Sequence, residues 1–277
     1  MISVIVSSHN LPIFSNFSKS LEKTIGVAYE IIKIPNPGLM SICEAYNLGA
    51  SKAKYDYLLF VHEDVLFHSN KWGTRLINHL DKENNGIIGL AGSNYVPASP
   101  SAWSVISCKY TFGNVNKVLE KNINQTKGAN EIQSVFALDG VFMAIKKSLY
   151  KEFLFNENIK GFHGYDTDFS LRVATKYKNY IVGDILIEHF SKGHPNKVWL
   201  DNHMKIRENI HYQFQEVYDQ NLEVQMFYAF LKKYFEYYDF NFKNIRTTIK
   251  FLPPKISFKN KLLILNEYLH YFVGVLK

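Results

Sequence analysis

The chain of 277 residues contains 47% hydrophobic and 21% charged residues. This length and composition are those of a globular protein with one large domain and an appendage, or with two small domains. The two cysteines, Cys43 and Cys108, form no metal-type spacing, and no apolar stretch reaches the about 18 residues of a membrane span. We therefore expect no zinc module and no transmembrane helix, and we expect the protein in a reducing cytoplasm.

The formal charge of +7 is unevenly distributed along the chain. Residues 221–277 carry nine Lys/Arg against four Asp/Glu, a net +5, which leaves +2 for the preceding 220 residues. The same tail holds 14 of the 42 aromatic residues. Two interpretations remain open. The tail is either a basic, aromatic surface that contacts anionic lipid or a helical appendage packed on the body of the protein.

Strand-like and helix-like segments alternate over the first 91 residues. Strands are predicted at residues 2–6, 29–34, 57–61 and 86–91, and helices at about residues 14–23, 41–53 and 71–80. Ser41 and Glu44 have the spacing of a capping box, which favours a helix start at Ser41. The alternation predicts right-handed parallel units, and hence an α/β fold with a mainly parallel sheet flanked by helices.

The pattern changes after residue 91. Residues 92–134 predict short strands and loops, and the apolar run at 135–145 is interrupted by Asp139 and Gly140. A carboxylate inside such a run is costly when it is buried without a partner, so Asp139 should have a partner or a function.

The last third of the chain is predicted to be mostly helical. A glycine-containing loop precedes a helix from Asp166, residues 180–187 read as extended, and helices are predicted at 197–216 and in the basic tail, which is broken at Pro253 and Pro254.

The buried strand at 57–61 is followed directly by His62, Glu63 and Asp64. In open α/β sheets, ligands bind in the crevice beyond the carboxyl ends of the strands. Acidic groups at this place can hold a divalent cation. The alternative is that these three residues begin a solvated loop.

Further charged groups stand at predicted strand or helix ends, namely Asp139, Asp166 with Asp168, and His189. Helix capping explains one of the two aspartates at 166 and 168. The sequence contains no phosphate-binding loop of the Walker type, no Gly-x-Ser-x-Gly motif and no dinucleotide fingerprint. Carboxylates together with an imidazole suit Mn²⁺ or Mg²⁺ beside a phosphate-bearing ligand.

Five short segments together resemble the nucleotide-sugar glycosyltransferases of the GT-A fold, close to family 2. The resemblance covers about residues 1–197. The segments are Ser8-His9-Asn10 after the first strand, Ala45-Tyr46-Asn47-Leu48-Gly49, the strand end His62-Glu63-Asp64, Asp139-Gly140-Val141-Phe142-Met143, and Gly164-Tyr165-Asp166-Thr167-Asp168 with the following Phe169-Ser170-Leu171-Arg172. The resemblance implies a GT-A domain at residues 1–197, which is Rossmann-like, with a helical extension at 198–277.

The resemblance also implies how a nucleotide-sugar donor and a Mn²⁺ or Mg²⁺ ion are bound. Asp64 corresponds to the last aspartate of the family's Asp-x-Asp motif, and His62 stands in place of the first, so the role of His62 stays open. His189 is expected to complete the metal site, with His194 as a rival. The residues expected to contact the donor are Ser8, Asn10, Asn36, Asn47, His62 and Glu63.

Asp166 aligns with the catalytic carboxylate, which in inverting members takes the proton of the acceptor hydroxyl. Contacts to a glycan or glycoconjugate acceptor are expected from Asp139, Gly140, Tyr165 and Asp168, although Asp168 could instead cap the helix or pair with Arg172.

The resemblance thus predicts a metal-dependent inverting glycosyltransferase of polysaccharide biosynthesis, cytoplasmic or at the inner face of the membrane, with no nucleic-acid partner. The alternatives are a non-catalytic nucleotide-sugar or glycan-binding relative and a nucleotidyltransferase.

Overall fold

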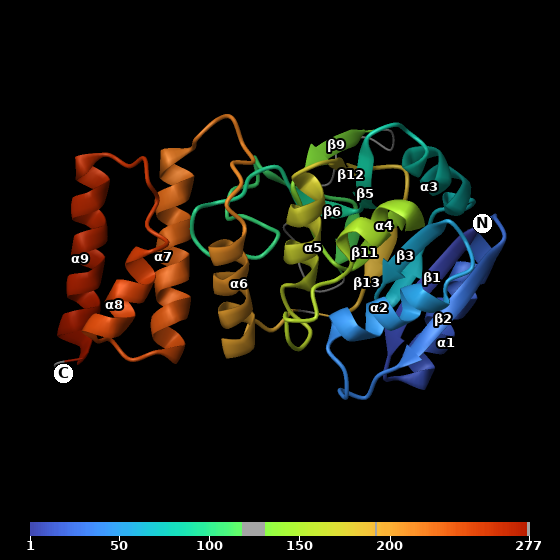
Figure 1. Cartoon of the computed structure of the whole chain (residues 1–277), viewed down its shortest axis with the longest axis horizontal. Helices are drawn as coiled ribbons and strands as arrows, with labels where there is room; N and C mark the ends of the chain where they lie inside the picture. Colours follow the sequence, from blue (N-terminus) through green and yellow to red (C-terminus); the bar gives the residue numbers. More distant parts are fainter. Residues whose placement is uncertain (118–130, 192, 276–277) are drawn as a thin grey trace.

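The computed structural model describes residues 1–117, 131–191 and 193–275. Part of the predicted 92–134 insertion therefore lies outside the described residues. Figure 1 shows an elongated molecule, with the strands toward one end and the last three helices at the other.

The strands are β1 (Ile2–Ser8), β2 (Tyr29–Pro35), β3 (Tyr57–Val61), β4 (Val65–Phe67), β5 (Asn85–Gly89), β6 (Ala91–Ser93), β7 (Thr111–Gly113), β8 (Val115–Lys117), β9 (Ile132–Val135), β10 (Ala137–Leu138), β11 (Phe142–Lys146), β12 (Lys178–Val182) and β13 (Ile187–His189). The helices are α1 (Leu11–Thr24), α2 (Ile42–Lys52), α3 (Trp72–Leu80), α4 (Lys147–Phe153), α5 (Tyr165–Ala174), α6 (Lys197–Asn209), α7 (Gln220–Tyr237), α8 (Phe242–Ile249) and α9 (Phe258–Val275).

The described residues form a seven-stranded sheet in the order β2-β1-β3-β11-β5-β12-β9. β1 is parallel to β2 and β3, and β12 is parallel to β5, whereas β11 runs antiparallel to both of its neighbours and β9 antiparallel to β12. The sheet is therefore mixed and mainly parallel, as predicted. Two three-stranded sheets, β10-β6-β7 and β4-β13-β8, lie beside it.

Helices cover both faces of the large sheet. α1 and α3 pack on one face through a core that includes Phe17 and Trp72, and α2, α4 and α5 pack on the other through Tyr46 and Phe169. The predicted capping box at Ser41 is present, because its hydroxyl accepts from the amide of Glu44 and its own amide donates to the Glu44 carboxylate. The capping box thus determines where α2 starts, and the apolar side chains of α2 determine which of its faces packs on the sheet.

The predicted helix at 197–216 is wrong in its length, since α6 ends at Asn209. The following residues 210–219 form no regular secondary structure. In this segment the Gln215 side chain accepts from the amide of Val96 and donates to its carbonyl. Phe214 joins the core of the sheet domain. Tertiary contacts therefore override the helical spacing of this segment.

The tail is helical, as predicted, and has a core of its own. That core is formed mainly by α7, by α9 and by the segment that joins α8 to α9, and includes Phe227, Phe251 and Ile264. α6 contributes Leu200 to this core and Ile206 to the core of the sheet domain, so a domain boundary at residue 197 stays a prediction. None of the described helices is long and apolar enough to span a bilayer.

Candidate active site

The antiparallel pairing of β13 with β4 brings the end of β13 to the residues that follow β3. His189 lies opposite Val65 in this pairing, and the amide of Phe190 donates to the carbonyl of Asp64 at 3.2 Å. The main chain thus holds His189 beside Asp64, although 125 positions separate them in the numbering. The two residues that were predicted as metal ligands are brought together.

His62 completes a triangle of side-chain atoms with these two. The Oδ1 of Asp64 lies 3.3 Å from the Nε2 of His189 and 3.9 Å from the Nδ1 of His62, and the two imidazole nitrogens lie 3.4 Å apart. Within the described residues, His62, Asp64 and His189 are the group whose geometry could hold a metal ion. The rival His194 is exposed and does not belong to this group.

The charge states of the triangle depend on burial and on its own members. Burial raises the pKa of Asp64, but the hydrogen bond and charge of His189 outweigh burial and hold that pKa well below its usual range. Burial and the neighbouring His189 lower the pKa of His62. An ionised carboxylate beside a neutral imidazole is the state in which these groups bind a cation.

His62 and Asp64 of the triangle line a cleft of about 740 Å³ beyond the carboxyl ends of β1, β2 and β3. His189 and Asp166 are not among the residues that line this cleft. The lining residues that were not predicted as site residues are Ser7, His9, Ile13, Pro37, Gly38, Ile42, Tyr46, Phe162 and Ser191. Of these residues, Ser191 could most readily have been predicted, because it follows the predicted metal ligand His189 by two residues. Its Oγ lies 3.1 Å from the Nε2 of that histidine. A second hollow, of about 750 Å³, lies at the base of the tail and holds none of the predicted site residues.

Two residues predicted to contact the donor, Glu63 and Asn10, make hydrogen bonds within the protein beside the cleft. The Glu63 carboxylate accepts from the amides of His9 and Asn10 at 3.0 and 3.2 Å, and from the Nδ1 of His9 at 2.8 Å. The Asn10 side chain caps α1 by accepting from the amide of Ile13. Glu63 and Asn10 therefore tie the end of β3 to the turn after β1.

The remaining donor predictions have different outcomes. Asn36 lines the cleft and closes its turn through hydrogen bonds to the main chain of Met40. Ser8 is buried and does not line the cleft, whereas Ser7 does. Successive side chains of a strand point to opposite faces, so Ser7 and Ser8 cannot both face the cleft, and a donor contact from either residue stays a prediction.

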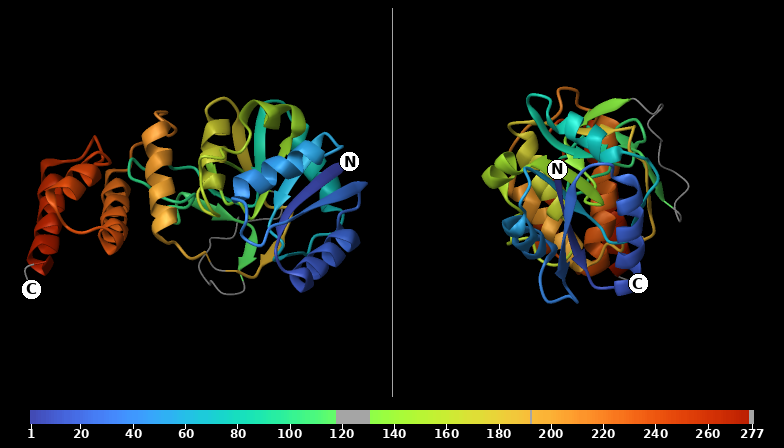
Figure 2. Two further views of the ribbon diagram at one scale, coloured as in Figure 1. Left: turned by 60° about the horizontal axis from the view of Figure 1, so that its bottom comes forward. Right: turned by 90° about the vertical axis from the view of Figure 1, so that its right-hand side faces the viewer.

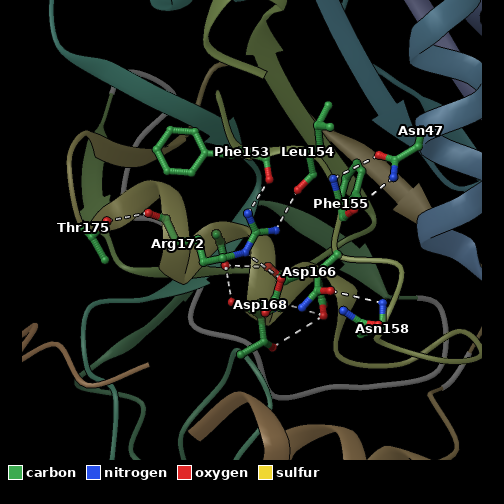
Figure 3. A network of polar contacts seen from close by, with 12 residues as sticks. Asn47, Phe153, Leu154, Phe155, Asn158, Asp166, Asp168, Arg172 and Thr175 are labelled. Carbon is green, nitrogen blue, oxygen red and sulfur yellow. Dashed lines mark hydrogen bonds and ion pairs between the residues drawn. The ribbon is translucent and has the colours of Figure 1, made fainter. Parts of the chain in front are cut away.

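Asn47 lies outside the cleft, contrary to the prediction. Its amide nitrogen donates to the carbonyl of Phe155 and to Glu157, and its amide oxygen accepts from the amide of Phe155 and from the Tyr150 hydroxyl. Figure 3 shows the two bonds with the main chain of Phe155, which use both ends of the Asn47 side chain. Asn47 therefore anchors α2 to the segment after α4 rather than binding a ligand.

Tyr165 links the triangle to the start of α5. Its hydroxyl lies 2.7 Å from the Nε2 of His62, on the side of the ring opposite the triangle. Gly140 lies against the same hydroxyl, and a Cβ built at that position would lie 2.0 Å from the Tyr165 Oη. Only glycine allows this close approach, so the Asp139-Gly140 turn, Tyr165 and His62 form one packed unit.

Asp166 begins the first turn of α5, directly after Tyr165. Its Oδ2 accepts from the amide of Gly140 at 3.1 Å and its Oδ1 from the amide of Thr167 at 2.8 Å. Burial and the nearby charge of Asp139 raise the pKa of the Asp166 carboxyl to about 7. Asp139 therefore has an electrostatic role here, while its Oδ1 accepts from the amide of Val141.

Asp168 is buried away from the cleft, and the structure favours the alternative in which it pairs with Arg172. Its Oδ2 accepts from the Nε of Arg172 at 2.8 Å, and the rest of that guanidinium donates to the carbonyls of Phe153 and Leu154. Figure 3 shows the guanidinium between the carboxylate and the two carbonyls. Breaking a buried pair of this kind costs about 3–5 kcal/mol, so Asp168 has a structural role rather than the predicted acceptor contact.

Comparison with known families and structures places this site in a wider context. The sequence matches the model of the "Glycosyltransferase like family" over residues 3–226. The chain belongs to this family. No curated protein matches this glycosyltransferase-like chain.

Solved structures of glycosyltransferases share its fold. The Staphylococcus aureus TarS 1-349 structure matches with a TM-score of 0.56 and 13% identity over 91% of this chain and 81% of that one. GalNAc-T7 with UDP, GalNAc and Mn²⁺ matches with a TM-score of 0.54 and 13% identity over 75% of this chain, which covers 47% of that chain and thus about half its length. The predicted GT-A fold is confirmed.

Proposed function

We propose that this glycosyltransferase-like chain transfers a sugar from a nucleotide-sugar donor to an acceptor hydroxyl, with inversion and with the help of a divalent cation. The observation that carries the proposal is the joining of the His62, Asp64 and His189 triangle to Asp166 through Tyr165 and Gly140. A cation site and a carboxylate able to accept a proton thus belong to one packed unit, which reaches the cleft through His62, Asp64 and Tyr165. TarS 1-349 in complex with UDP-GlcNAc and GalNAc-T7 with UDP and Mn²⁺ support this choice of ligands.

The residues of the triangle fit a divalent cation. Two imidazole nitrogens and one carboxylate oxygen converge, and the remaining nitrogen of His62 is held by the Tyr165 hydroxyl, as ligating histidines commonly are. Nitrogen ligands favour Mn²⁺ over Mg²⁺, which prefers oxygen. A cation bound here would supply Lewis-acid stabilisation to a departing nucleoside diphosphate.

Asp166 is the base in this proposal. A sugar hydroxyl is a weak nucleophile, and a carboxylate with a pKa of about 7 can take its proton near neutral pH. In one step the hydroxyl oxygen bonds to the anomeric carbon, the bond from that carbon to the diphosphate oxygen breaks, and the proton passes to Asp166. The electron pair leaves with the nucleoside diphosphate, and attack from the opposite side inverts the anomeric centre.

The other residues of the cleft bind and orient the ligands. The main-chain amide of Gly140 fixes one oxygen of the Asp166 carboxylate and leaves its position defined before an acceptor arrives. Asn36, Ser7 and His9 line the cleft at the carboxyl ends of β1 and β2, where the nucleoside would lie. The cleft volume of about 740 Å³ lies within the usual range of ligand pockets, so the cleft has room for a nucleotide together with its sugar.

The pH dependence of transfer tests this assignment. Because Asp166 must be ionised to accept a proton, kcat/KM is expected to rise with pH through about 7 and then to level off. The charged neighbour that raises this pKa is Asp139, while Tyr46 and Tyr165 stay neutral since burial raises their pKa values. Asp139→Asn is therefore expected to move the rising limb to lower pH.

Initial rates are measured from pH 5 to pH 9 for the wild type and Asp139→Asn, and the pH at the midpoint of the rise in kcat/KM is compared. This midpoint does not depend on how much the substitution slows transfer at every pH. An unchanged limb in the variant, or a rate that falls as pH rises through 7, would contradict Asp166 as the base.

A further inference from the structure

The outer face of α9 carries a continuous apolar stripe. Its five members recur at alternating intervals of four and three residues, and each is between 50% and 75% exposed. They are Phe258, Leu262, Leu265, Leu269 and Phe272. This spacing places them on one side of a helix over about 14 residues, or about 21 Å of its length. The feature is called the α9 stripe below.

The opposite face of α9 packs in the core of the tail. Ile264 is buried there, and the ring of Tyr271 lies 4.8 Å from the ring of Phe235 on α7. Figures 1 and 2 show α9 as the outermost helix, at the end of the molecule away from the large sheet. The α9 stripe therefore faces away from the rest of the described chain.

The surroundings of the α9 stripe are basic. Residues 242–277 contain seven Lys/Arg and one Asp/Glu, a net charge of +6. Lys259 and Lys261 on α9 are exposed beside the first turns of the stripe. The single carboxylate, Glu267, lies 4.0 Å from the imidazole of His270 on the same helix.

These observations argue against a second copy of the chain as the partner of the stripe. A strip about 21 Å long and about 10 Å wide offers about 200 Å² per copy, whereas a stable interface buries about 800 Å² on each partner. Paired α9 helices also carry no complementary set of acidic residues to face the lysines. A negatively charged surface that accepts apolar side chains fits both properties.

We propose that α9 docks on an anionic membrane surface, lying in the plane of the interface with its stripe among the acyl chains and its lysines at the headgroups. An amphipathic helix with an apolar face and basic flanks binds lipid in this way. None of the described helices is long and apolar enough to span a bilayer, which fits a helix that lies on the surface. This proposal is independent of the transfer reaction, because the α9 stripe contributes no residue to the cleft.

Flotation of the full chain with vesicles tests the docking. The wild type is expected to float with vesicles of 70% phosphatidylcholine and 30% phosphatidylglycerol, and to float far less with phosphatidylcholine alone. Leu265→Gln with Leu269→Gln keeps the charge and the helix propensity and removes apolar area, so the partition coefficient is expected to fall at least about 10-fold. The matched control is Asn266→Gln with His270→Gln, two exposed polar positions of the same turns, which should bind like the wild type.

Circular dichroism and thermal melting of each variant show whether it is folded. Wild-type protein that stays in the dense fraction with both vesicle types, or a stripe variant that floats like the wild type, overturns the proposal. A wild type that light scattering finds dimeric, and that becomes monomeric in the stripe variant without a change in flotation, overturns it in favour of a second copy. Transfer from a soluble donor to a soluble acceptor should be equal in all of these proteins, so failure here leaves the proposed reaction untouched.

Discussion

Asp166→Asn is expected to lower kcat for sugar transfer by about 10²- to 10⁴-fold, which is the contribution of a well-placed general base. The asparagine amide keeps the size of the side chain but cannot take a proton from the acceptor hydroxyl. The hydrogen bond from the amide of Gly140 can still reach the remaining side-chain oxygen. Donor affinity should therefore stay within about twofold, since the change removes an interaction used in the transition state.

The measurement pairs steady-state rates with calorimetric titration of the donor. Asp56→Asn is a suitable control, because it makes the same chemical change at an exposed position before β3, at the end of that strand away from the cleft. A variant at position 166 that keeps more than one-tenth of the wild-type kcat would contradict the role of Asp166, as would equal losses in both variants.

Asp64→Ala is expected to abolish Mn²⁺ binding at the cleft and, with it, metal-dependent donor binding. Asp64 supplies the one carboxylate of the triangle, held ionised because the hydrogen bond and charge of His189 outweigh the effect of burial on its pKa. Removing a residue that only orients a metal-ligating side chain lowers metal affinity by about 10- to 100-fold. Removing the ligating carboxylate of Asp64 itself should lower the affinity more.

The binding of Mn²⁺ can be followed through the electron paramagnetic resonance signal of the free ion. Glu188→Ala is the matched control. It also removes a carboxylate, next to His189 in the sequence, but that carboxylate lies 3.1 Å from the Nε2 of His68 and does not belong to the triangle. The account requires a strong effect at Asp64 and a small one at Glu188. Equal Mn²⁺ affinity in the wild type and Asp64→Ala would show that the metal does not bind at the triangle.

The sequence predicts most of the sheet domain, because its strands and helices carry strong periodic patterns. The segments 2–6, 29–34 and 57–61 form β1, β2 and β3, and the spacing around Ser41 predicts the start of α2. The direction of β11 was not predictable, since an apolar run fits a parallel or an antiparallel neighbour equally well. β11 comes late in the chain yet lies between β3 and β5, and only long-range pairing determines that position.

The candidate site divides in a similar way. The sequence places Asp64 after a strand and Asp166 in the first turn of a helix, and both positions could be predicted. The short β4–β13 pairing that brings His189 to Asp64 could not be predicted. The hydrogen bonds of Asn47 to the segment after α4 and the pairing of Asp168 with Arg172 could not be read from the sequence, because a sequence does not show which polar side chains bind the main chain or an arginine. The hydrogen bond between the Tyr165 hydroxyl and His62 was not predicted, and the acceptor contact expected of Tyr165 stays a prediction.

The most direct test of the central claim is calorimetric titration of the full chain with UDP-, GDP- and dTDP-sugars, once with Mn²⁺ and once with a chelator, together with chromatography of the products. The account predicts that at least one nucleotide sugar binds with Mn²⁺ and binds at least about 10-fold more weakly without it. In the absence of an acceptor, water takes the place of the acceptor hydroxyl, so this donor is slowly hydrolysed to the free sugar and the nucleoside diphosphate. Equal binding in both conditions with no hydrolysis would instead indicate a binding protein, and release of pyrophosphate from a nucleoside triphosphate would indicate a nucleotidyltransferase. Either result would contradict the proposed glycosyl transfer.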